Sequence, residues 1–189
     1  RCNPFSKNRN GITIGEGVAL YLLSKEPGPV QLLGVGESSD AYHITAPHVE
    51  GAGAVRAMQQ ALGMAGLKAE DIDYVNLHGT ATPANDRMES IAMNKVFPRS
   101  VPCSSTKALT GHTLGAAGAT ETGICWLLLS PLNKEKKLAP QLWDGVKDEE
   151  LMELNLVKPG SAAQRLNICM SNSFAFGGSN ASVILGRAK

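Results

Sequence analysis

The sequence predicts a layered α/β fold, because runs typical of short buried strands alternate with segments of helical periodicity along its 189 residues. Composition supports this prediction. Hydrophobic residues make up 43% of the chain and charged residues 19%, which suits one domain with a sizeable core or part of a larger one. Polar clusters also follow several of the expected strands, which is where α/β folds place their sites.

The expected strands are short apolar or β-branched runs bounded by turn residues. They cover 12–23, interrupted at Gly15 and Gly17, and then 30–35, 71–77, 101–105, 166–171 and 181–186. The last two flank a cluster of Phe and Gly residues, so they should form a closing hairpin.

Three segments favour helices, through apolar residues at helical spacing or through terminal signals. They are 52–65, ended by Gly66; about 86–96, opened by the capping-box spacing of Asp86 and Glu89; and 120–129, ended by Pro131. The region 131–165 is the least periodic, and its charge runs are typical of solvated faces.

The composition also argues against several kinds of partner. A net charge of +1 gives no global basic field, so nucleic-acid binding is not expected. No apolar run reaches the length of a membrane span and no signal peptide is present, so we expect no membrane partner. The chain begins at Arg1 rather than Met, which suggests a truncated or processed product.

The four cysteines form no CxxC pair, which argues against a zinc site or a redox dithiol. Cys103, Cys125 and Cys169 lie in apolar runs and are interpreted as reduced core thiols. Reduced thiols are typical of a cytoplasmic protein.

The stretch 107–119 combines Lys107 and His112 with a tract of small residues. A second polar cluster, 76–80, contains His78, and a glycine-aromatic cluster covers 172–178. Each cluster follows an expected strand. Because the carboxyl ends of parallel strands meet at one edge of a sheet, the three clusters should converge in one pocket.

A pair such as His78 and His112 can bind metal, transfer protons or donate hydrogen bonds to a developing anion. A metal site is the weakest interpretation, because no third ligand lies at a recognisable spacing and Lys107 would repel a cation. Two neutral histidines aimed at a carbonyl oxygen would form an oxyanion or enolate site, each donor being worth roughly 3–4 kcal/mol of barrier. Glu121 is either the partner of Lys107 or a residue of the helix surface.

Other features have simpler interpretations. His43 and His48 lie in the polar loop 36–50 without a partner in their own segment, so we interpret them as loop or surface residues. The glycines of 111–118 allow close backbone packing, and they form no phosphate loop because no Gly-Lys-Ser/Thr ending is present. The cluster 174–178 is either a hydrophobic hairpin tip or a hinged gate for an apolar substrate.

Three motifs resemble the C-terminal motifs of the β-ketoacyl-[acyl-carrier-protein] synthases, the elongating condensing enzymes of fatty-acid and polyketide synthesis in the thiolase superfamily. They are His-Gly-Thr-Ala-Thr-Pro-Ala-Asn-Asp at 78–86, Lys-Ala-Leu-Thr-Gly-His-Thr-Leu-Gly-Ala-Ala-Gly at 107–118 and Asn-Ser-Phe-Ala-Phe-Gly-Gly at 172–178. Similar stretches at 9–11, 15–17 and 38–43 extend the resemblance over nearly the whole chain.

The resemblance implies one half of a thiolase-like α/β/α/β/α fold, with a mixed sheet and helices on both faces. Residues 1–29 would end the N-terminal half of the synthase, and 30–189 would be the C-terminal domain. The implied enzyme is an acyltransferase that condenses malonyl carrier protein with an acyl thioester by decarboxylative Claisen chemistry. It implies no cofactor and no metal.

Four residues match the charge-stabilising groups of that family. His78 and His112 match the two histidines that bind the malonyl thioester carbonyl and stabilise its enolate. Lys107 matches the lysine that supports His112 electrostatically, and Glu121 matches the acid that pairs with this lysine.

Five residues match the gate or the substrate-binding wall. Phe176 matches the gating aromatic, whose backbone N–H contributes to the oxyanion hole, and Phe174 matches a nearby pocket-wall Phe. Gly177, Thr80 and Thr110 are expected at gate or substrate-binding positions within the same motifs.

Some features qualify the match. The loop 38–47 matches a mobile loop that moves with the gate. Ala175 stands where the family usually has Gly, which should stiffen the gate. Between Leu23 and Val30 the chain is shorter than in typical members, which carry a helical extension there.

The resemblance also implies a cysteine nucleophile at a strand-to-helix elbow in the N-terminal half. None of the four cysteines has that setting. Cys103 comes nearest, but it lies on the strand that leads to Lys107 and is interpreted as a core residue. The full-length protein should therefore be an enzyme, whereas this chain alone should not catalyse condensation.

Two alternatives remain. One is a non-catalytic partner subunit similar to a chain-length factor, which the intact His78, His112 and Lys107 disfavour. The other, thiolase-type acyl transfer, is less favoured because Phe174 and Phe176 stand where that branch has a second cysteine. The expected partners are acyl carrier protein carrying an acyl or malonyl-phosphopantetheine group and, at full length, a second copy in a homodimer.

Overall fold

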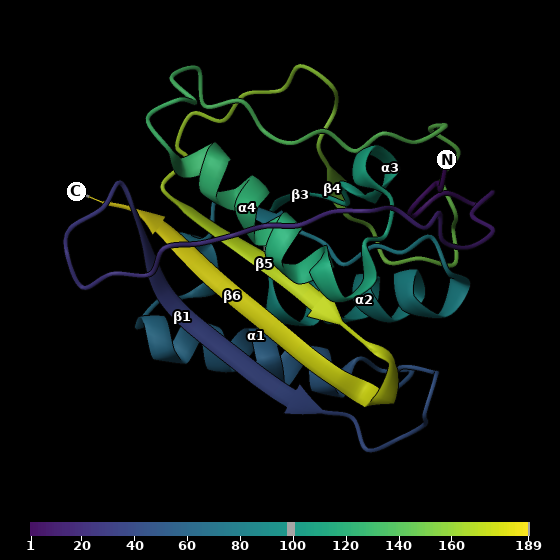
Figure 1. The fold of residues 1–189 in the computed structure, drawn as a ribbon. Coiled ribbons are helices and arrows are strands. Elements are labelled where there is room, and N and C mark those ends of the chain that lie inside the picture. Colours follow the sequence, from purple (N-terminus) through teal and green to yellow (C-terminus); the bar gives the residue numbers. More distant parts are fainter. Residues whose placement is uncertain (98–100, 189) are drawn as a thin grey trace.

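The protein is built around a six-stranded mixed sheet, seen here in a computed structural model that describes residues 1–97 and 101–188 (Figure 1). The strand order is β1-β6-β5-β2-β3-β4. The strands are β1 Val30–Ser39, β2 Tyr74–Asn76, β3 Pro102–Ser104, β4 Asn155–Leu156, β5 Ile168–Phe174 and β6 Ser179–Arg187. β6 pairs antiparallel with β1 and with β5, whereas β2 runs parallel to both β3 and β5. The expected closing hairpin is confirmed as β5 and β6.

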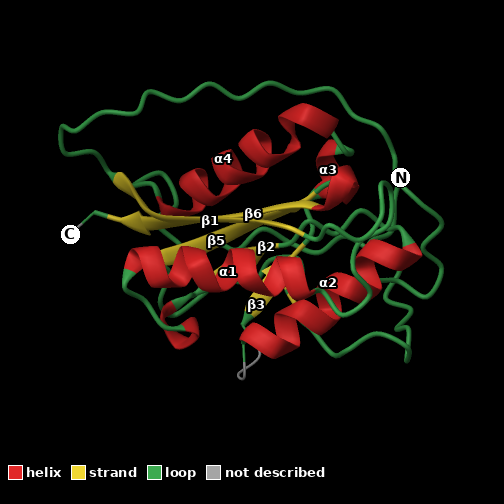
Figure 2. Cartoon of the chain, turned by 90° about the horizontal axis from the view of Figure 1, so that it is seen from below, coloured by secondary structure: helices red, strands yellow, loops and turns green. Residues whose placement is uncertain are grey.

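Helices cover both faces of this sheet (Figure 2). The helices α1 Ala52–Ala65 and α2 Pro83–Val96 lie on one face, and α3 Lys107–Thr110 and α4 Ala117–Leu129 lie on the other. Short 3-10 turns lie between α1 and β2 (η1 Ala69–Asp71), between α3 and α4 (η2 Leu114–Ala116) and between β5 and β6 (η3 Phe176–Gly178). The predicted α/β class, with a mixed sheet between helical layers, is therefore confirmed. Sequence patterns did not indicate α3 or the two-residue strand β4.

Each helical layer buries its own hydrophobic core against the sheet. Met58 of α1 and Met88 of α2 pack in one cluster with Val75 and Phe97. The other cluster lies between α4 and the sheet and includes Leu129. The predicted core thiols are confirmed, because the following cysteines are free and 0% exposed: Cys103, Cys125 and Cys169.

The end of α1 follows the predicted mechanism. Gly66 has φ 64° and ψ 29°, a left-handed conformation that favours glycine, and its N–H donates to the carbonyl oxygens of the last turn. No helix in residues 1–97 and 101–188 combines the length and apolar character that a membrane crossing requires.

The strand predicted at 12–23 is wrong. This segment is extended but joins no ladder of the described sheet, and its one backbone pairing is the isolated bridge between Ile14 and His112. It runs along the outer side of α4, separated from the sheet by that helix (Figures 1 and 2). Alternating apolar side chains therefore point into solvent, with Leu20 92% and Leu22 94% exposed.

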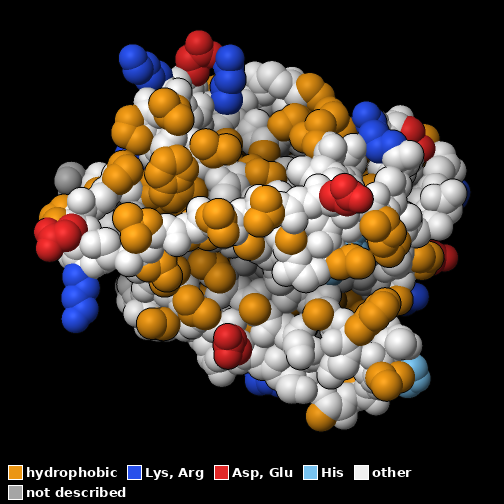
Figure 3. All heavy atoms as spheres, in the orientation of Figure 1, with side chains coloured by type: hydrophobic (Ala, Val, Ile, Leu, Met, Phe, Trp, Pro, Cys, Tyr) orange, Lys and Arg blue, Asp and Glu red, His pale blue; other side chains and the backbone are white. Residues whose placement is uncertain are grey.

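The outer surface of α4 is apolar as well. Its buried residues recur every fourth position, at Ala117, Glu121, Cys125 and Leu129, and face the sheet. Yet apolar residues also cover the opposite side, where Leu127 is 52% exposed. Figure 3 shows hydrophobic side chains spread across this face of the molecule. A helix with apolar residues on all its sides is usually buried on all sides by other parts of a protein.

The capping box predicted at the start of α2 is also wrong. Thr82 caps the helix, accepting a hydrogen bond from the Asn85 N–H, and Pro83 is the first helical residue. Asp86 and Glu89 instead lie inside the helix with 0% exposure, on the side facing the sheet edge. The predicted end of this helix near Val96 is confirmed.

Candidate functional site

Three loops converge where parallel strands end. β2 leads to His78 and β3 leads to Lys107, while Phe174 ends β5, which pairs with β2 on its other side. The ring centroids of His78 and His112 lie 5.4 Å apart with their planes at 83°. The ring of Phe174 lies 6.1 Å from that of His78. The predicted meeting of the three sequence clusters is thus confirmed.

Lys107 lies at the centre of this site, with 1% of its surface exposed. Its ammonium donates a hydrogen bond to the His78 carbonyl oxygen at 2.6 Å and lies 3.5 Å from His78 Nδ1. It also forms an ion pair with Glu121, which is 1% exposed. The alternative of a surface Glu121 is excluded, because its carboxylate is buried against the lysine. Burial raises the pKa of Glu121, while Lys107 opposes that rise.

Both histidines favour the neutral form. Burial, then Lys107, then His112 lower the pKa of His78 well below its ordinary value. Burial and, after it, Lys107 lower the pKa of His112 to about 4. Lys107 therefore acts electrostatically on both rings, although of the two histidines it hydrogen-bonds only His78. Near neutral pH each ring carries one N–H donor.

The position of that proton follows from the hydrogen bonds of the rings. His112 Nδ1 accepts from the Leu114 backbone N–H at 3.4 Å, and His78 Nδ1 faces the Lys107 ammonium. A nitrogen that faces a donor is an acceptor, so the proton of each ring is assigned to Nε2. The site therefore presents two neutral Nε2–H donors close together.

Two buried carboxylates hold the His78 loop from behind. Glu89 accepts the His78 N–H at 2.8 Å and the Gly79 N–H at 2.7 Å, one with each oxygen. Asp86 accepts the Phe5 N–H at 2.8 Å and the Ala81 N–H at 3.2 Å. Neither role was predicted from the sequence. The available signal was the presence of two acids on the apolar face of α2.

Burial shifts the pKa values of these two carboxyl groups upward. It raises the pKa of Glu89 to about 7, although the two backbone N–H groups pull it downward. It raises the pKa of Asp86 to about 6 against the same kind of hydrogen bond. Both groups therefore titrate in a range where free carboxyl groups are fully ionised.

The Phe/Gly loop is tied to the neighbouring loop 38–48. Gly177, with φ 79°, donates its N–H to the Ile44 carbonyl oxygen at 2.7 Å. The Asp40 N–H donates to the Gly178 carbonyl oxygen at 2.8 Å. The Asp40 carboxylate accepts from the His48 N–H at 3.0 Å and from the Asn180 amide at 2.9 Å.

The two predicted phenylalanines differ in their surroundings. Phe174 is buried beside His78, whereas Phe176 is 79% exposed and, among the residues described, its ring contacts neither histidine ring. Ala175 leaves β5 in an extended conformation and pairs with Ser179 across the loop. The structure therefore brings Phe174 to the histidines and leaves Phe176 at the surface.

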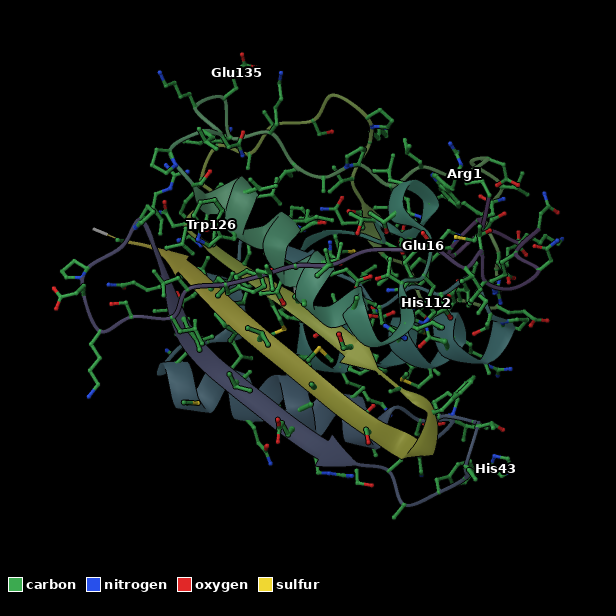
Figure 4. All side chains as sticks on the ribbon, viewed as in Figure 1. Arg1, Glu16, His43, His112, Trp126 and Glu135 are labelled. Atoms are coloured by element: carbon green, nitrogen blue, oxygen red, sulfur yellow. The ribbon has the colours of Figure 1, made fainter. Side chains whose placement is uncertain are left out.

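The predicted threonines make local hydrogen bonds. The Thr80 hydroxyl is 2.9 Å from that of Thr82, in the turn between His78 and α2. The Thr110 hydroxyl donates to the Gly111 carbonyl oxygen at 2.8 Å, two residues before His112. Figure 4 shows His43 on the loop beyond β1, well away from His112, as expected for a loop residue.

Among the described residues, the site is marked neither by a cluster of metal ligands nor by the large cavity of the fold. Within residues 1–97 and 101–188, no three His, Cys, Asp or Glu side chains gather as metal ligands. A cavity of about 1130 Å³ lies elsewhere, lined by Phe97, Trp143 and Leu151 among others, and includes none of the site residues. The site is recognised from its polar geometry instead.

Comparison with known proteins agrees with this geometry. The C-terminal domain of β-ketoacyl synthases matches residues 30–141. Proteins named 3-oxoacyl-[acyl-carrier-protein] synthase 2 are 37% identical in Coxiella burnetii and 36% identical in Staphylococcus aureus, in both cases over 97% of this chain. The chain spans about half the length of these relatives, 46% and 47%.

Solved structures give the same assignment. One chain in the structure of the ketosynthase–chain length factor complex ApeO–ApeC, from Xenorhabdus doucetiae, is 49% identical over 99% of this chain and 46% of its own length, with a TM-score of 0.86. A β-ketoacyl synthase from Burkholderia phymatum is 33% identical over all of this chain and 47% of its own length, with a TM-score of 0.83. Because the family domain covers more than half of the sequence and the histidine loops adopt one site, the chain belongs to the β-ketoacyl synthase family, with its thiolase-like fold.

Proposed function

We propose that the chain is the C-terminal part of a decarboxylating β-ketoacyl-[acyl-carrier-protein] synthase, and that His78 and His112 bind the malonyl thioester carbonyl while its enolate forms. The observation that carries this proposal is the pair of neutral imidazoles, 5.4 Å apart, whose Nδ1 atoms both face donors. Their Nε2–H groups are left to donate to a substrate oxygen.

This arrangement suits decarboxylation. When the bond between the α-carbon and the carboxylate carbon breaks, CO₂ leaves and the electron pair moves into the enolate. The negative charge collects on the thioester oxygen, where two fixed donors are worth roughly 3–4 kcal/mol each. The α-carbon then attacks an acyl thioester, whose sulfur leaves as a thiolate. Lys107 adds positive charge beside both rings without competing for the proton on Nε2.

The nucleophile that holds the acyl group is proposed to lie outside these 189 residues. All four cysteines are buried. Burial raises the pKa of Cys103, and the contact with Cys125 followed by burial raises the pKa of Cys169, which disfavours the reactive thiolate. Cys2 donates to the carbonyl oxygen of Lys107, the first residue of α3, at 3.3 Å.

A second structural half would explain the exposed apolar surface. We propose that residues 1–29 end an N-terminal half and that 30–189 form the C-terminal domain. Support comes from the extended segment, where Leu20 and Leu22 are almost fully exposed, and from the apolar outer side of α4. Covering this surface would give the α/β/α/β/α layering of a complete synthase.

The gate assignment is also a proposal. Phe176 and Gly177 lie on a loop with left-handed glycines, joined by hydrogen bonds to the loop 38–48. An exposed aromatic on such a loop can swing toward the histidines when an acyl chain enters. Thr80 and Thr110, next to the histidine loops, would line the approach of the substrate arm.

A non-catalytic, chain-length-factor-like subunit is the second candidate, because the similar structures include ketosynthase and chain-length-factor complexes. The complete set of His78, His112, Lys107 and Glu121 favours the catalytic subunit. The proposed partners are acyl carrier protein bearing acyl or malonyl groups and a second synthase-type subunit in a dimer. The free thiols are compatible with a cytoplasmic location.

The assay that tests the proposal measures CO₂ release from malonyl carrier protein by the intact synthase, with acyl transfer measured separately. Substituting either histidine by alanine should lower CO₂ release by about 10²–10³-fold. CO₂ release within twofold of the unsubstituted enzyme would refute the role of the histidines. Condensation by the 189-residue chain alone would refute the placement of the nucleophile.

A further inference from the structure

One short segment hydrogen-bonds to both histidine loops. Residues 11–15, named the brace here, begin with Gly11, whose N–H donates to the Ala81 carbonyl oxygen at 2.9 Å. Two residues on, the Thr13 carbonyl oxygen accepts the His112 N–H at 2.7 Å. Gly15 then donates its N–H to the His112 carbonyl oxygen at 3.1 Å. The brace therefore connects the loop after His78 with His112 itself.

His112 depends on these contacts for its backbone position. It lies between α3, which ends at Thr110, and the 3-10 turn that begins at Leu114, so no regular element includes it. Both of its main-chain groups are bonded to the brace, one to Thr13 and one to Gly15. Figure 4 shows Glu16, the residue after the brace, in the same part of the fold as His112.

Gly15 and Gly111 allow this contact because their backbones touch. A Cβ atom on Gly15 would lie 2.2 Å from the Thr110 carbonyl oxygen and 3.0 Å from Gly111 Cα. A Cβ atom on Gly111 would lie 2.8 Å from both Cα and N of Gly15, and Gly111 also has φ +70°. Any side chain at position 15 must therefore push the brace away from the residue that precedes His112.

Core packing does not explain the brace. Its apolar side chains are largely in solvent, with Ile12 43% and Ile14 58% exposed. What the segment contributes is backbone hydrogen bonding and the close Gly15–Gly111 approach. Its two ends contact the loops that carry the two Nε2–H donors, so it spans the distance between them.

We propose that the brace is a positioning element of the enolate site and that Gly15 is its positioning residue. This inference rests on the proposed function for its catalytic meaning, but its structural content can be tested without any activity. The brace fixes the main chain of His112, and that main chain sets the direction in which the imidazole points.

The experiment uses two variants of the brace, Gly15→Ala and an insertion of one glycine after Ile12. The insertion adds about 3.3–3.6 Å of chain, so the brace must bulge outward or release one of its two ends. The matched control is Gly28→Ala, between the extended segment and β1, where an added Cβ would meet nothing closer than 3.9 Å. Amide hydrogen exchange and NMR titration of the His112 ring are measured on the chain itself.

We expect both brace variants to speed exchange of the His112 amide at least tenfold and to move the midpoint of its ring titration upward from about 4. Amides of β5 and of the Cys125 region should keep their protection, and the control should match the unsubstituted chain. The proposal is overturned if the His112 amide and ring are unchanged in the insertion variant, or if they change only together with the amides of β5.

A second readout separates this inference from the proposed function. In the intact synthase, Gly15→Ala should lower kcat for CO₂ release at least tenfold, with acyl transfer and the KM for malonyl carrier protein changed less than threefold. If the exchange results hold but His112→Ala leaves CO₂ release unaltered, the brace stands and the proposed function fails. If His112→Ala lowers CO₂ release but the brace variants leave it unchanged, the inference fails and the proposed function stands.

Discussion

The Lys107 ammonium and the His78 carbonyl oxygen are 2.6 Å apart, in a site where the lysine is almost completely buried. The same ammonium faces His78 Nδ1 and is paired with Glu121. One cation thereby bonds the main chain of one histidine and selects its tautomer, and, second to burial, its charge lowers the pKa of both rings. The lysine serves the site as a whole and not only His112.

The ion pair predicts that substitutions of Lys107 and Glu121 have non-additive effects on the free energy of unfolding. Lys107→Met leaves the Glu121 carboxyl buried without its cation, which should lower the free energy of unfolding by about 3–5 kcal/mol. The double variant Lys107→Met/Glu121→Gln removes the stranded charge and should be clearly more stable than Lys107→Met alone. Urea unfolding of the unsubstituted chain, Lys107→Met, Glu121→Gln and the double variant measures this coupling. Equal stability of the single and double variants would show that the pair is not coupled.

Glu89 predicts a specific pH dependence of stability. Its pKa in the folded chain is about 7, above its ordinary value of 4.5, so the folded state binds the proton more tightly. The stabilisation from the protonated carboxyl is present below about pH 4.5 and is lost as the pH rises through about 7. The expected loss is on the order of 3 kcal/mol.

The His78 and His112 rings contribute the opposite slope, because their lowered pKa values remove stability as the pH falls. The Glu89 effect is therefore measured as a difference. The free energies of unfolding of the unsubstituted chain and of Glu89→Gln are compared between pH 4.5 and 8. The free energy of unfolding of the unsubstituted chain should fall relative to that of Glu89→Gln as the pH rises, because the charged Glu89 is disfavoured in the folded state. A constant difference would contradict a buried titrating carboxyl.

Gly79 should tolerate no side chain. It has φ +40°, and an added Cβ would lie 2.4 Å from Ser105 Cβ and 2.8 Å from the Phe5 ring. Gly79→Ala should lower the free energy of unfolding by about 2–3 kcal/mol. Gly63→Ala is the control, since its Cβ would meet nothing within 4 Å. In the helix α1 it should stabilise by about 0.5–1 kcal/mol, and destabilisation of equal size in both variants would count against the steric argument.

Asp40 should couple the two surface loops. Replacing it by alanine removes the acceptor of the His48 N–H and of the Asn180 amide, at a cost of about 1 kcal/mol. Hydrogen exchange of the Gly177 amide, which is bonded to Ile44, should become faster. Asp40→Asn keeps one acceptor oxygen and should have a smaller effect. Unchanged exchange at Gly177 in Asp40→Ala would mean that the loops are held independently.

Local patterns were sufficient for much of the fold. The spacing of apolar residues and Gly66 identified α1, and the two runs around the Phe/Gly cluster identified the hairpin of β5 and β6. The site followed from one topological rule, that residues after parallel strands meet at one edge. That rule placed His78 beside Lys107 and Phe174.

The errors have physical causes. Alternating apolar residues at 12–23 describe an extended chain, but the pattern does not reveal whether a strand edge lies within reach. Asp86 and Glu89 have the spacing of a capping box, and only the folded chain shows that their carboxylates bind amides of the His78 loop. The brace was missed because its contacts run through the backbone, so side-chain identity gives no signal beyond Gly15.

The central claim is that His78 and His112 are neutral at pH 7 with the proton of each ring on Nε2. The most direct test is a long-range ¹⁵N–¹H NMR spectrum of the ¹⁵N-histidine-labelled chain at pH 7, with His78→Gln and His112→Gln for assignment. We predict one protonated nitrogen per ring, Nε2, and one unprotonated nitrogen, Nδ1, with His112 becoming imidazolium only near pH 4. An imidazolium ring at pH 7, or a proton on Nδ1 of either ring, would contradict the account.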